Sequence, residues 1–206
     1  MELPLFPTLE SARLAAEHCR GCSRAATRQN VVFGHGNPNA ALMLIGESPS
    51  ATDDSTGKPF TGPAGRLLDA LLSELGLHLR DIWITNLVRC HAGAIKAGRI
   101  ENLPPRVGEI RACETWLDLE LRYVDPTVIL AVGAPAARRL IDPAFKLKEQ
   151  RGVESVRVDG RIAIATIQPA YVMRLATIDP GAQLAARDDL LSDLRLAAMR
   201  AGLLPT

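Results

Sequence analysis

The stretch ALMLIG (41–46), followed by ESPSATDDSTGKPFTGP (47–63) and AGRLLDALLSEL (64–75), decides the fold class. The first segment is a short apolar run of the kind that forms a buried strand. The last segment has apolar residues at helical spacing, and Gly76 directly after it is a common helix stop. A buried strand, a polar loop and an amphipathic helix in this order are the repeating unit of an α/β protein.

The same alternation continues along the chain. It predicts strands at 81–88, 127–132 and 162–167. It also predicts a helix that begins between residues 7 and 11 and ends at about residue 19, and further helices at 107–123, 134–141 and 182–201. Segment 89–105 is expected to be a long irregular connection, a class that is usually functional or disordered. We therefore expect one domain, 1–206, with a three-layer α/β/α fold around a central, mostly parallel four-stranded sheet.

Length, charge and hydropathy favour a single globular domain over a membrane-spanning or secreted protein. The 206 residues suit one globular core, and the formal net charge of +1 means that any nucleic-acid contact must come from a local basic face. No apolar run approaches the roughly 20 residues that cross a bilayer. The N-terminal segment lacks the apolar core of a signal peptide. We expect a cytoplasmic monomer that does not enter the membrane.

Unusual residues follow the predicted strands where each strand ends. Gly46, Glu47 and Ser48 follow the first strand, Asn86 ends the second, and Gln168 follows the fourth. The carboxyl ends of parallel strands lie at one edge of a sheet, and ligands of open α/β sheets bind there. We expect the functional site at this edge.

Cysteines form a second candidate site. Cys19 and Cys22 make a C-x2-C pair, and the fold must bring Cys90 and Cys113 to them. Four thiolates suit a [4Fe–4S] cluster or a structural zinc ion, and spacing does not choose between these. The alternative is that the pair occurs by chance and the other two are ordinary core cysteines.

The loop after the first strand is rich in small residues, which let the backbone approach a ligand closely. Phe60 is the aromatic member of this loop. Such a ring can stack on a nucleic-acid base, an interaction of about 1–3 kcal/mol. The alternative is a phenylalanine that packs into the core.

The segment GESPSATDDSTGKPFTGPAGRLLD (46–69) resembles the corresponding segment of the iron–sulfur (type 4) uracil-DNA glycosylases and of their uracil-crosslinking relatives of the UdgX type. ITNLVRC (84–90), the cysteine order and IQPAYVMR (167–174) are also similar to theirs, so the resemblance covers most of the chain. It implies a uracil-DNA glycosylase-like fold and a [4Fe–4S] cluster on the four cysteines.

The resemblance also implies roles in the pocket. Asn86 is expected to pair with uracil N3 and O4, and Phe60 to stack on the flipped base, beside Gly46. Glu47 is expected to position water or to hold the loop. Ser48 stands where some other glycosylase families have a water-activating aspartate, so Asp53 and Asp54 are candidate substitutes. Strand-end asparagines and loop acids also serve as ordinary caps, which is the alternative for these residues.

Two departures from the family pattern concern catalysis. Gln168 stands where the family has a histidine, and a glutamine donates only a neutral hydrogen bond to uracil O2. Glu101 follows Arg99 and Ile100 where the crosslinking relatives have the histidine that captures the sugar. A carboxylate here would stabilise the sugar cation or activate water, so we expect no stable crosslink. The alternative is that Glu101 pairs with Arg99 or faces solvent.

The same resemblance predicts the DNA contacts. Tyr171, Met173 and Arg174 lie in the segment that enters the minor groove, where apolar wedges beside a basic residue hold the gap left by a flipped base. Phosphate contacts are expected from Lys58, Lys96, Arg99, Arg106 and Arg174.

The predicted function is hydrolysis of the N-glycosidic bond of uracil in single- or double-stranded DNA. Three alternatives stay open: a lesion-binding protein of the same fold with little catalysis, a glycosylase for hypoxanthine or xanthine, and a zinc-ribbon-like interaction protein.

Overall fold

The computed structural model describes residues 6–96 and 99–205, and it describes the side chains of these residues except those of 94–101. Its main sheet has six strands in the order β1-β3-β2-β6-β8-β7. The strands are β1 (His35–Gly36), β2 (Leu42–Gly46), β3 (Trp83–Asn86), β6 (Val128–Val132), β7 (Ser155–Val156) and β8 (Ile162–Thr166). A separate hairpin consists of β4 (Gly93–Lys96) and β5 (Arg99–Asn102).

The four strands predicted from sequence form the parallel centre of this sheet. β2 pairs in parallel with both β3 and β6, and β6 pairs in parallel with β8. The prediction of four strands is corrected to six, because β1 and β7 add antiparallel pairs at the two edges. Each edge strand has only two residues, which is too short to produce a recognisable alternation of apolar and polar residues.

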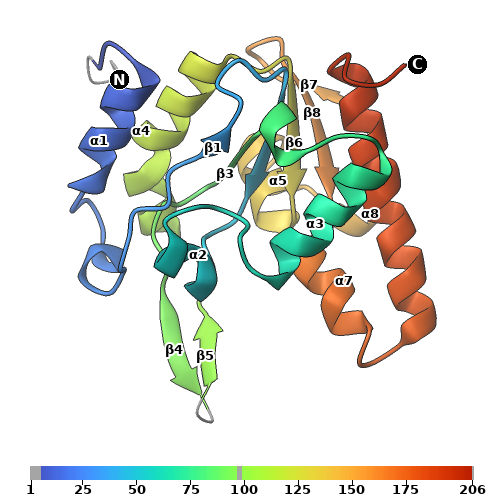
Figure 1. The fold of residues 1–206 in the computed structure, drawn as a ribbon, viewed down its shortest axis with the longest axis horizontal. Coiled ribbons are helices and arrows are strands. Elements are labelled where there is room, and N and C mark those ends of the chain that lie inside the picture. Colours follow the sequence, from blue (N-terminus) through green and yellow to red (C-terminus); the bar gives the residue numbers. More distant parts are fainter. Residues whose placement is uncertain (1–5, 97–98, 206) are drawn as a thin grey trace.

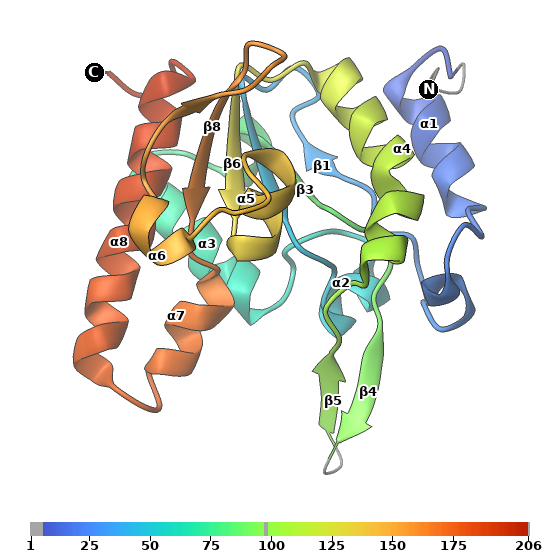
Figure 2. The same cartoon turned by 180° about the vertical axis from the view of Figure 1, so that it is seen from behind.

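Helices cover both faces of the sheet, so the three-layer prediction is confirmed (Figures 1 and 2). One face packs against a core that includes residues of α1, α4 and α5, and the other against a core that includes residues of α3, α7 and α8. The helices are α1 (Leu9–Glu17), α2 (Ala51–Thr56), α3 (Pro63–Glu74), α4 (Val107–Val124), α5 (Ala134–Leu140), α6 (Leu147–Gln150), α7 (Pro169–Leu175) and α8 (Pro180–Arg200). Short 3-10 turns lie at Ser23–Ala26 and Leu79–Asp81. In the described part of the chain, no helix combines the length and the apolar character that a bilayer crossing needs.

Two segments that were predicted to be irregular are ordered. The polar loop after β2 contains α2, which begins with a capping box between Ser50 and Asp53. This helix has only six residues and too few apolar positions to produce a helical pattern. Segment 89–105 contains the β4–β5 hairpin, which projects from the edge of the sheet where the central strands end (Figure 1).

A buried ion pair connects β3 to α4. Arg89 and Glu120 have side chains that are 1% and 0% exposed, and Arg89 Nη2 lies 3.1 Å from Glu120 Oε2. Glu120 also accepts a hydrogen bond of 2.8 Å from the Gly34 backbone N–H. Arg89 lies over the Phe33 ring, 5.8 Å from its centroid, and donates to the Asn86 carbonyl. The pair therefore fixes the chain at the end of β3.

We expect Glu120→Gln to lower the free energy of unfolding by about 3–5 kcal/mol, because it leaves the Arg89 charge buried and unpaired. The matched control on the same helix is Glu114→Gln, which removes a partly exposed pair with Arg139 and should cost at most about 1 kcal/mol. Urea unfolding followed by circular dichroism measures both. Equal losses in the two variants would show that the buried pair has no special role.

Candidate active site

A cavity of about 660 Å³ opens at the carboxyl edge of the sheet. Its walls come from the ends of β2, β3 and β6, the loop before α3, the start of α7 and the end of the β4–β5 hairpin. The chain runs from β2 outward to β3 and then returns past β2 to β6, so the order of connection reverses beside β2. Ligands of open α/β sheets bind at such a reversal.

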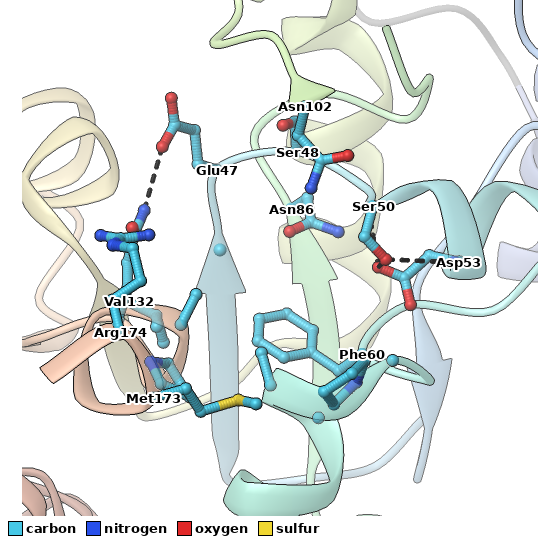
Figure 3. A pocket seen from close by; sticks show the side chains of 18 of the residues that line it. Glu47, Ser48, Ser50, Asp53, Phe60, Asn86, Asn102, Val132, Met173 and Arg174 are labelled. Atoms are coloured by element: carbon cyan, nitrogen blue, oxygen red, sulfur yellow. Dashed lines mark hydrogen bonds between the residues drawn. The ribbon is translucent and has the colours of Figure 1, made fainter. Parts of the chain in front are cut away.

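The side chains of Phe60 and Asn86 line the same cavity (Figure 3). Gly46, the last residue of β2, lies against both of them. A Cβ atom on Gly46 would lie 2.5 Å from Asn86 Oδ1 and 2.8 Å from Phe60 Cζ. Both distances are shorter than van der Waals contact, so only glycine lets the amide and the ring approach the strand together. The ring and the amide therefore line one hollow.

The Phe60 ring is presented by a strained turn. Phe60 has a φ of 56°, a left-handed conformation that is costly for a residue other than glycine and that occurs mainly at functional sites. Asp53 anchors the next residue, since its Oδ1 accepts hydrogen bonds from the Thr61 N–H (2.7 Å) and hydroxyl (2.9 Å). Gly65 leaves room for the turn, because a Cβ there would lie 1.6 Å from the Phe60 carbonyl oxygen.

Asn86 is 2% exposed, and Arg89 binds its backbone carbonyl. The Asn86 side chain faces the cavity and presents both an acceptor and a donor. A buried amide of this kind favours a ligand that pairs with both groups, because leaving them unpaired costs free energy.

Glu47 and Gln168 form the polar wall opposite Asn86. Gln168 Nε2 donates a hydrogen bond of 3.0 Å to Glu47 Oε2 (Figure 3). This bond orients the amide and uses one of its two N–H groups, so the other is free to donate to a ligand. Ser48 lies on the same rim as Glu47.

Met173 and Arg174 from α7 line the mouth of the cavity, and the Met173 side chain is 39% exposed. Tyr171, on the same helix, is 41% exposed and is not part of the cavity wall. The structure thus brings Met173 and Arg174 to the site and places Tyr171 on the surface beside it.

Asp54 lies outside the cavity wall, which is a correction to its expected place in the site. Its two oxygens accept hydrogen bonds from the backbone N–H groups of Gln29 (2.9 Å) and Asn30 (3.1 Å). The carboxylate therefore ties α2 to the segment before β1. It also lies 3.9 Å from His91 Nδ1, and His91 Nε2 lies 3.0 Å from Asn102 Oδ1.

Sequence reasoning missed Asn102, Leu103 and Pro104, which line the cavity from the end of the hairpin. The only signal for them is that they directly follow Glu101 in a segment that was expected to be irregular. The side chains of Arg99 and Glu101, for which roles were predicted, lie outside the described residues. Their backbones belong to β5, where Glu101 pairs with Ala94.

The four cysteines are free and come from three segments: Cys19 and Cys22 lie together, Cys90 follows β3, and Cys113 lies on α4. Three of their sulfur atoms accept hydrogen bonds. Arg89 N–H donates to Cys113 Sγ (3.3 Å), Trp116 Nε1 and Gly21 N–H donate to Cys19 Sγ (3.3 and 3.4 Å), and Arg28 Nη1 donates to Cys90 Sγ (3.4 Å). Donors that point at sulfur stabilise thiolates, the form that binds metal.

Burial raises the pKa of Cys90 to about 11 and also raises the pKa of Cys113. The neighbouring cysteines raise these pKa values further, Cys113 and Cys22 for Cys90, and Cys19 and Cys22 for Cys113. The four sulfurs therefore share one region. Within the described ranges, no group of three or more His, Cys, Asp or Glu surrounds a point where a single ion would sit.

A second buried ion pair connects this cysteine region to the cavity. Arg24, two residues after Cys22, pairs with Glu109 at 2.9 Å. Arg24 also donates to the Cys90 carbonyl (3.1 Å) and to the carbonyl of Leu103 (3.0 Å), a residue of the cavity wall. Burial opposes the charge of Glu109, but hydrogen bonds from Arg106, Arg24 and Ser23 outweigh it and lower the pKa of Glu109 to about 2. The pair is thus charged at neutral pH.

The family model and the similar proteins that we report are all uracil-DNA glycosylases. Residues 33–195 match the model of the uracil DNA glycosylase superfamily. The chain is 34% identical to a type-4 uracil-DNA glycosylase of Thermotoga maritima, over 76% of this chain and 78% of the relative. It is 35% identical to a type-4 enzyme of Saccharolobus solfataricus (81% and 72%) and 30% identical to a type-5 uracil-DNA glycosylase of Pyrobaculum aerophilum (71% and 75%).

Proposed function

The chain belongs to the uracil DNA glycosylase superfamily, and from this premise we propose that it excises uracil from DNA by hydrolysing the N-glycosidic bond. The observation that carries the proposal is the joint approach of the Phe60 ring and the Asn86 amide to Gly46 across one cavity. Such a hollow matches a flat ring with a polar edge. Uracil reaches it only when the nucleotide is flipped out of the stack.

Base recognition follows from the two groups that meet at Gly46. The Phe60 ring stacks on the pyrimidine, and the Asn86 amide accepts from uracil N3–H and donates to O4. Cytosine presents the opposite pattern at these two atoms, an acceptor at N3 and an amino group at C4. Pairing with cytosine would leave the buried amide unsatisfied, which discriminates against the normal base.

Bond cleavage places negative charge on the departing uracil and positive charge on the sugar. The free N–H of Gln168 donates to uracil O2, and its bond to Glu47 keeps it aimed before the reaction. Water then adds its oxygen to sugar C1′, and the proton that it loses ends on the released base. We assign Glu47 Oε1 to orient this water, because the other carboxylate oxygen, Oε2, already accepts the hydrogen bond from Gln168.

Gln168 is a neutral donor, so it stabilises the leaving anion less than a protonated imidazole would. We assign stabilisation of the positive charge on the sugar to carboxylates, to Glu47 of the cavity wall and, by the resemblance to the crosslinking relatives, to Glu101. Glu101 occupies the position of the trapping histidine in the UdgX-type relatives that the sequence resembles. An ester between a carboxylate and C1′ is open to water, so turnover is expected rather than capture.

Contacts with DNA outside the pocket are assigned to α7. Met173 and Arg174 lie at the cavity mouth, and Tyr171 is exposed beside them. An apolar side chain in the minor groove holds the gap left by the flipped nucleotide, and Arg174 pairs with a phosphate.

We assign a [4Fe–4S] cluster to Cys19, Cys22, Cys90 and Cys113. The donor set fits, because four cysteines supply the four thiolates that such a cluster needs and three of the sulfurs already accept N–H hydrogen bonds. The cluster would contribute folding free energy and take no part in base release. Arg24 would link the cluster site to the cavity wall, because it donates hydrogen bonds to the carbonyls of both Cys90 and Leu103.

The first test is base release from uracil-containing DNA under single-turnover conditions. We expect Asn86→Ala to lower kcat/KM by at least about a hundredfold, because it removes both contacts to the base edge. We expect Phe60→Ala to lower it by about 5- to 150-fold through lost stacking. Asn39→Ala, in an exposed loop, is the control. Wild-type protein that binds uracil-DNA without releasing base would instead identify a lesion-binding protein, and preferred release of hypoxanthine or xanthine would identify a different substrate.

The second test distinguishes hydrolysis from capture. Denaturing electrophoresis of wild-type protein with uracil-DNA should show no persistent shifted band, whereas Glu101→His should produce one because imidazole forms a bond to C1′ that water does not cleave. Glu47→Gln should slow release by about a hundredfold or more if Glu47 orients the water. A persistent wild-type band that disappears in Glu101→Gln would contradict the assignment.

The third test concerns the cysteines. Anaerobically purified protein should contain iron and acid-labile sulfide in equal amounts, with the visible absorbance of an iron–sulfur centre. Cys113→Ser should lose this absorbance and lower the thermal unfolding temperature. One zinc ion per chain without sulfide would contradict the cluster and favour the zinc alternative.

A further inference from the structure

A second cavity, of about 620 Å³, lies beside the end of α2. Its walls come from α1, the segment between that helix and β1, and the turn at Gly57 and Lys58 that ends α2. Figure 1 shows these elements together on one flank of the molecule. We call this hollow the basic cavity, because its lining includes Arg13, Arg20, Arg28 and Lys58 but only one acidic residue, Glu17.

Two of these four cations are already engaged. Arg13 is held between Glu10 and Glu17, at 2.6 and 2.5 Å. Arg28 donates to the Cys19 carbonyl at 2.6 Å and to Cys90 Sγ at 3.4 Å. Arg20 and Lys58 are exposed, and in the described part of the chain neither has an acidic side chain within 4 Å. The unbalanced charge of the cavity therefore belongs to these two residues.

His35 lines the basic cavity together with Lys58. Its pKa is lowered, first by burial and then by the charge of Lys58. The other charged groups in the cavity lining are Arg13, Glu17, Arg20 and Arg28. A neutral imidazole next to unpaired cations offers a hydrogen-bond donor to an anion without adding to the repulsion.

The basic cavity adjoins the active site through one short segment. Lys58 lines the basic cavity and Phe60 lines the active site. Two residues of fully extended chain span at most about 7 Å, so the two hollows are separated by little more than this turn. A ligand whose ring stacks on Phe60 and whose chain continues past α2 would reach Lys58.

We propose that the basic cavity binds phosphate groups of the DNA strand that flank the flipped nucleotide, with Arg20 and Lys58 as the contacting residues. The proposal rests on the proposed function, which supplies a polyanionic strand at the neighbouring site. Phosphodiester groups match the unpaired cations in charge, and their oxygens accept hydrogen bonds from guanidinium and ammonium groups. This contact would add affinity and register without reading the sequence.

The test measures DNA affinity against salt concentration with uracil-free single-stranded DNA, so it is informative even if the protein releases no base. Log K falls as log [salt] rises, and each phosphate contact that is lost on single-stranded DNA makes this slope shallower by about 0.7. We expect Lys58→Ala and Arg20→Ala each to produce this change, and Lys58→Arg to restore most of the affinity. The control is Lys148→Ala with Arg195→Ala, two exposed cations on α6 and α8. An unchanged slope in Lys58→Ala, or an equal fall in the control, would overturn the proposal.

Two further arms identify the source of the phosphate. DNA that is shortened from one end should lose its sensitivity to Lys58→Ala once the contacted phosphates are gone, whereas sensitivity at every length would contradict a local contact. The His35 ring signals in NMR should shift with this DNA at concentrations where inorganic phosphate alone has little effect. A shift with inorganic phosphate and none with DNA would identify a small-anion site and overturn the assignment to DNA. Because Arg20 lies between Cys19 and Cys22, the visible absorbance of Arg20→Ala is compared with that of the wild type. Equal absorbance shows that the substitution has not damaged the cysteine site.

Discussion

The missing side chain of Gly46 is the constraint on which the site depends. Any larger residue at the end of β2 would collide with both the Asn86 amide and the Phe60 ring. The hollow therefore exists because three distant parts of the sequence meet where one strand presents only backbone. The parallel sheet makes this meeting possible, since it brings the ends of β2 and β3 to adjacent positions, with Gly46 opposite Asn86.

The groups around this hollow are held by polar contacts that leave little freedom. Asp53 fixes the turn that presents Phe60, and Arg89 fixes the backbone of Asn86 through its buried pair with Glu120. The Arg89 backbone N–H also donates to Cys113 Sγ, so Asn86 and the cysteine region contact the same residue. Groups that are held in place before a ligand binds need no reorganisation, which is the condition for electrostatic catalysis.

Most of the fold and the centre of the site followed from the sequence. The central strands are apolar runs that can be recognised in the sequence. Gly46 and Asn86 end two of them, and Gln168 follows a third. The hairpin was not foreseen, because its strands, Gly93–Lys96 and Arg99–Asn102, contain no apolar run longer than two residues. Asn102 was missed for the same reason. Asp54 was assigned to the wrong environment, because sequence alone does not show that backbone N–H groups from residues 29 and 30 occupy both of its oxygens.

The central claim is that a pyrimidine ring occupies the hollow between Phe60 and Asn86, and a crystal structure of the protein with free uracil tests it most directly. The account predicts electron density for the base stacked on the Phe60 ring, with its N3–C4 edge against the Asn86 amide and O2 near Gln168. Density for uracil at another place, or an Asn86 side chain turned away from the base, would contradict it.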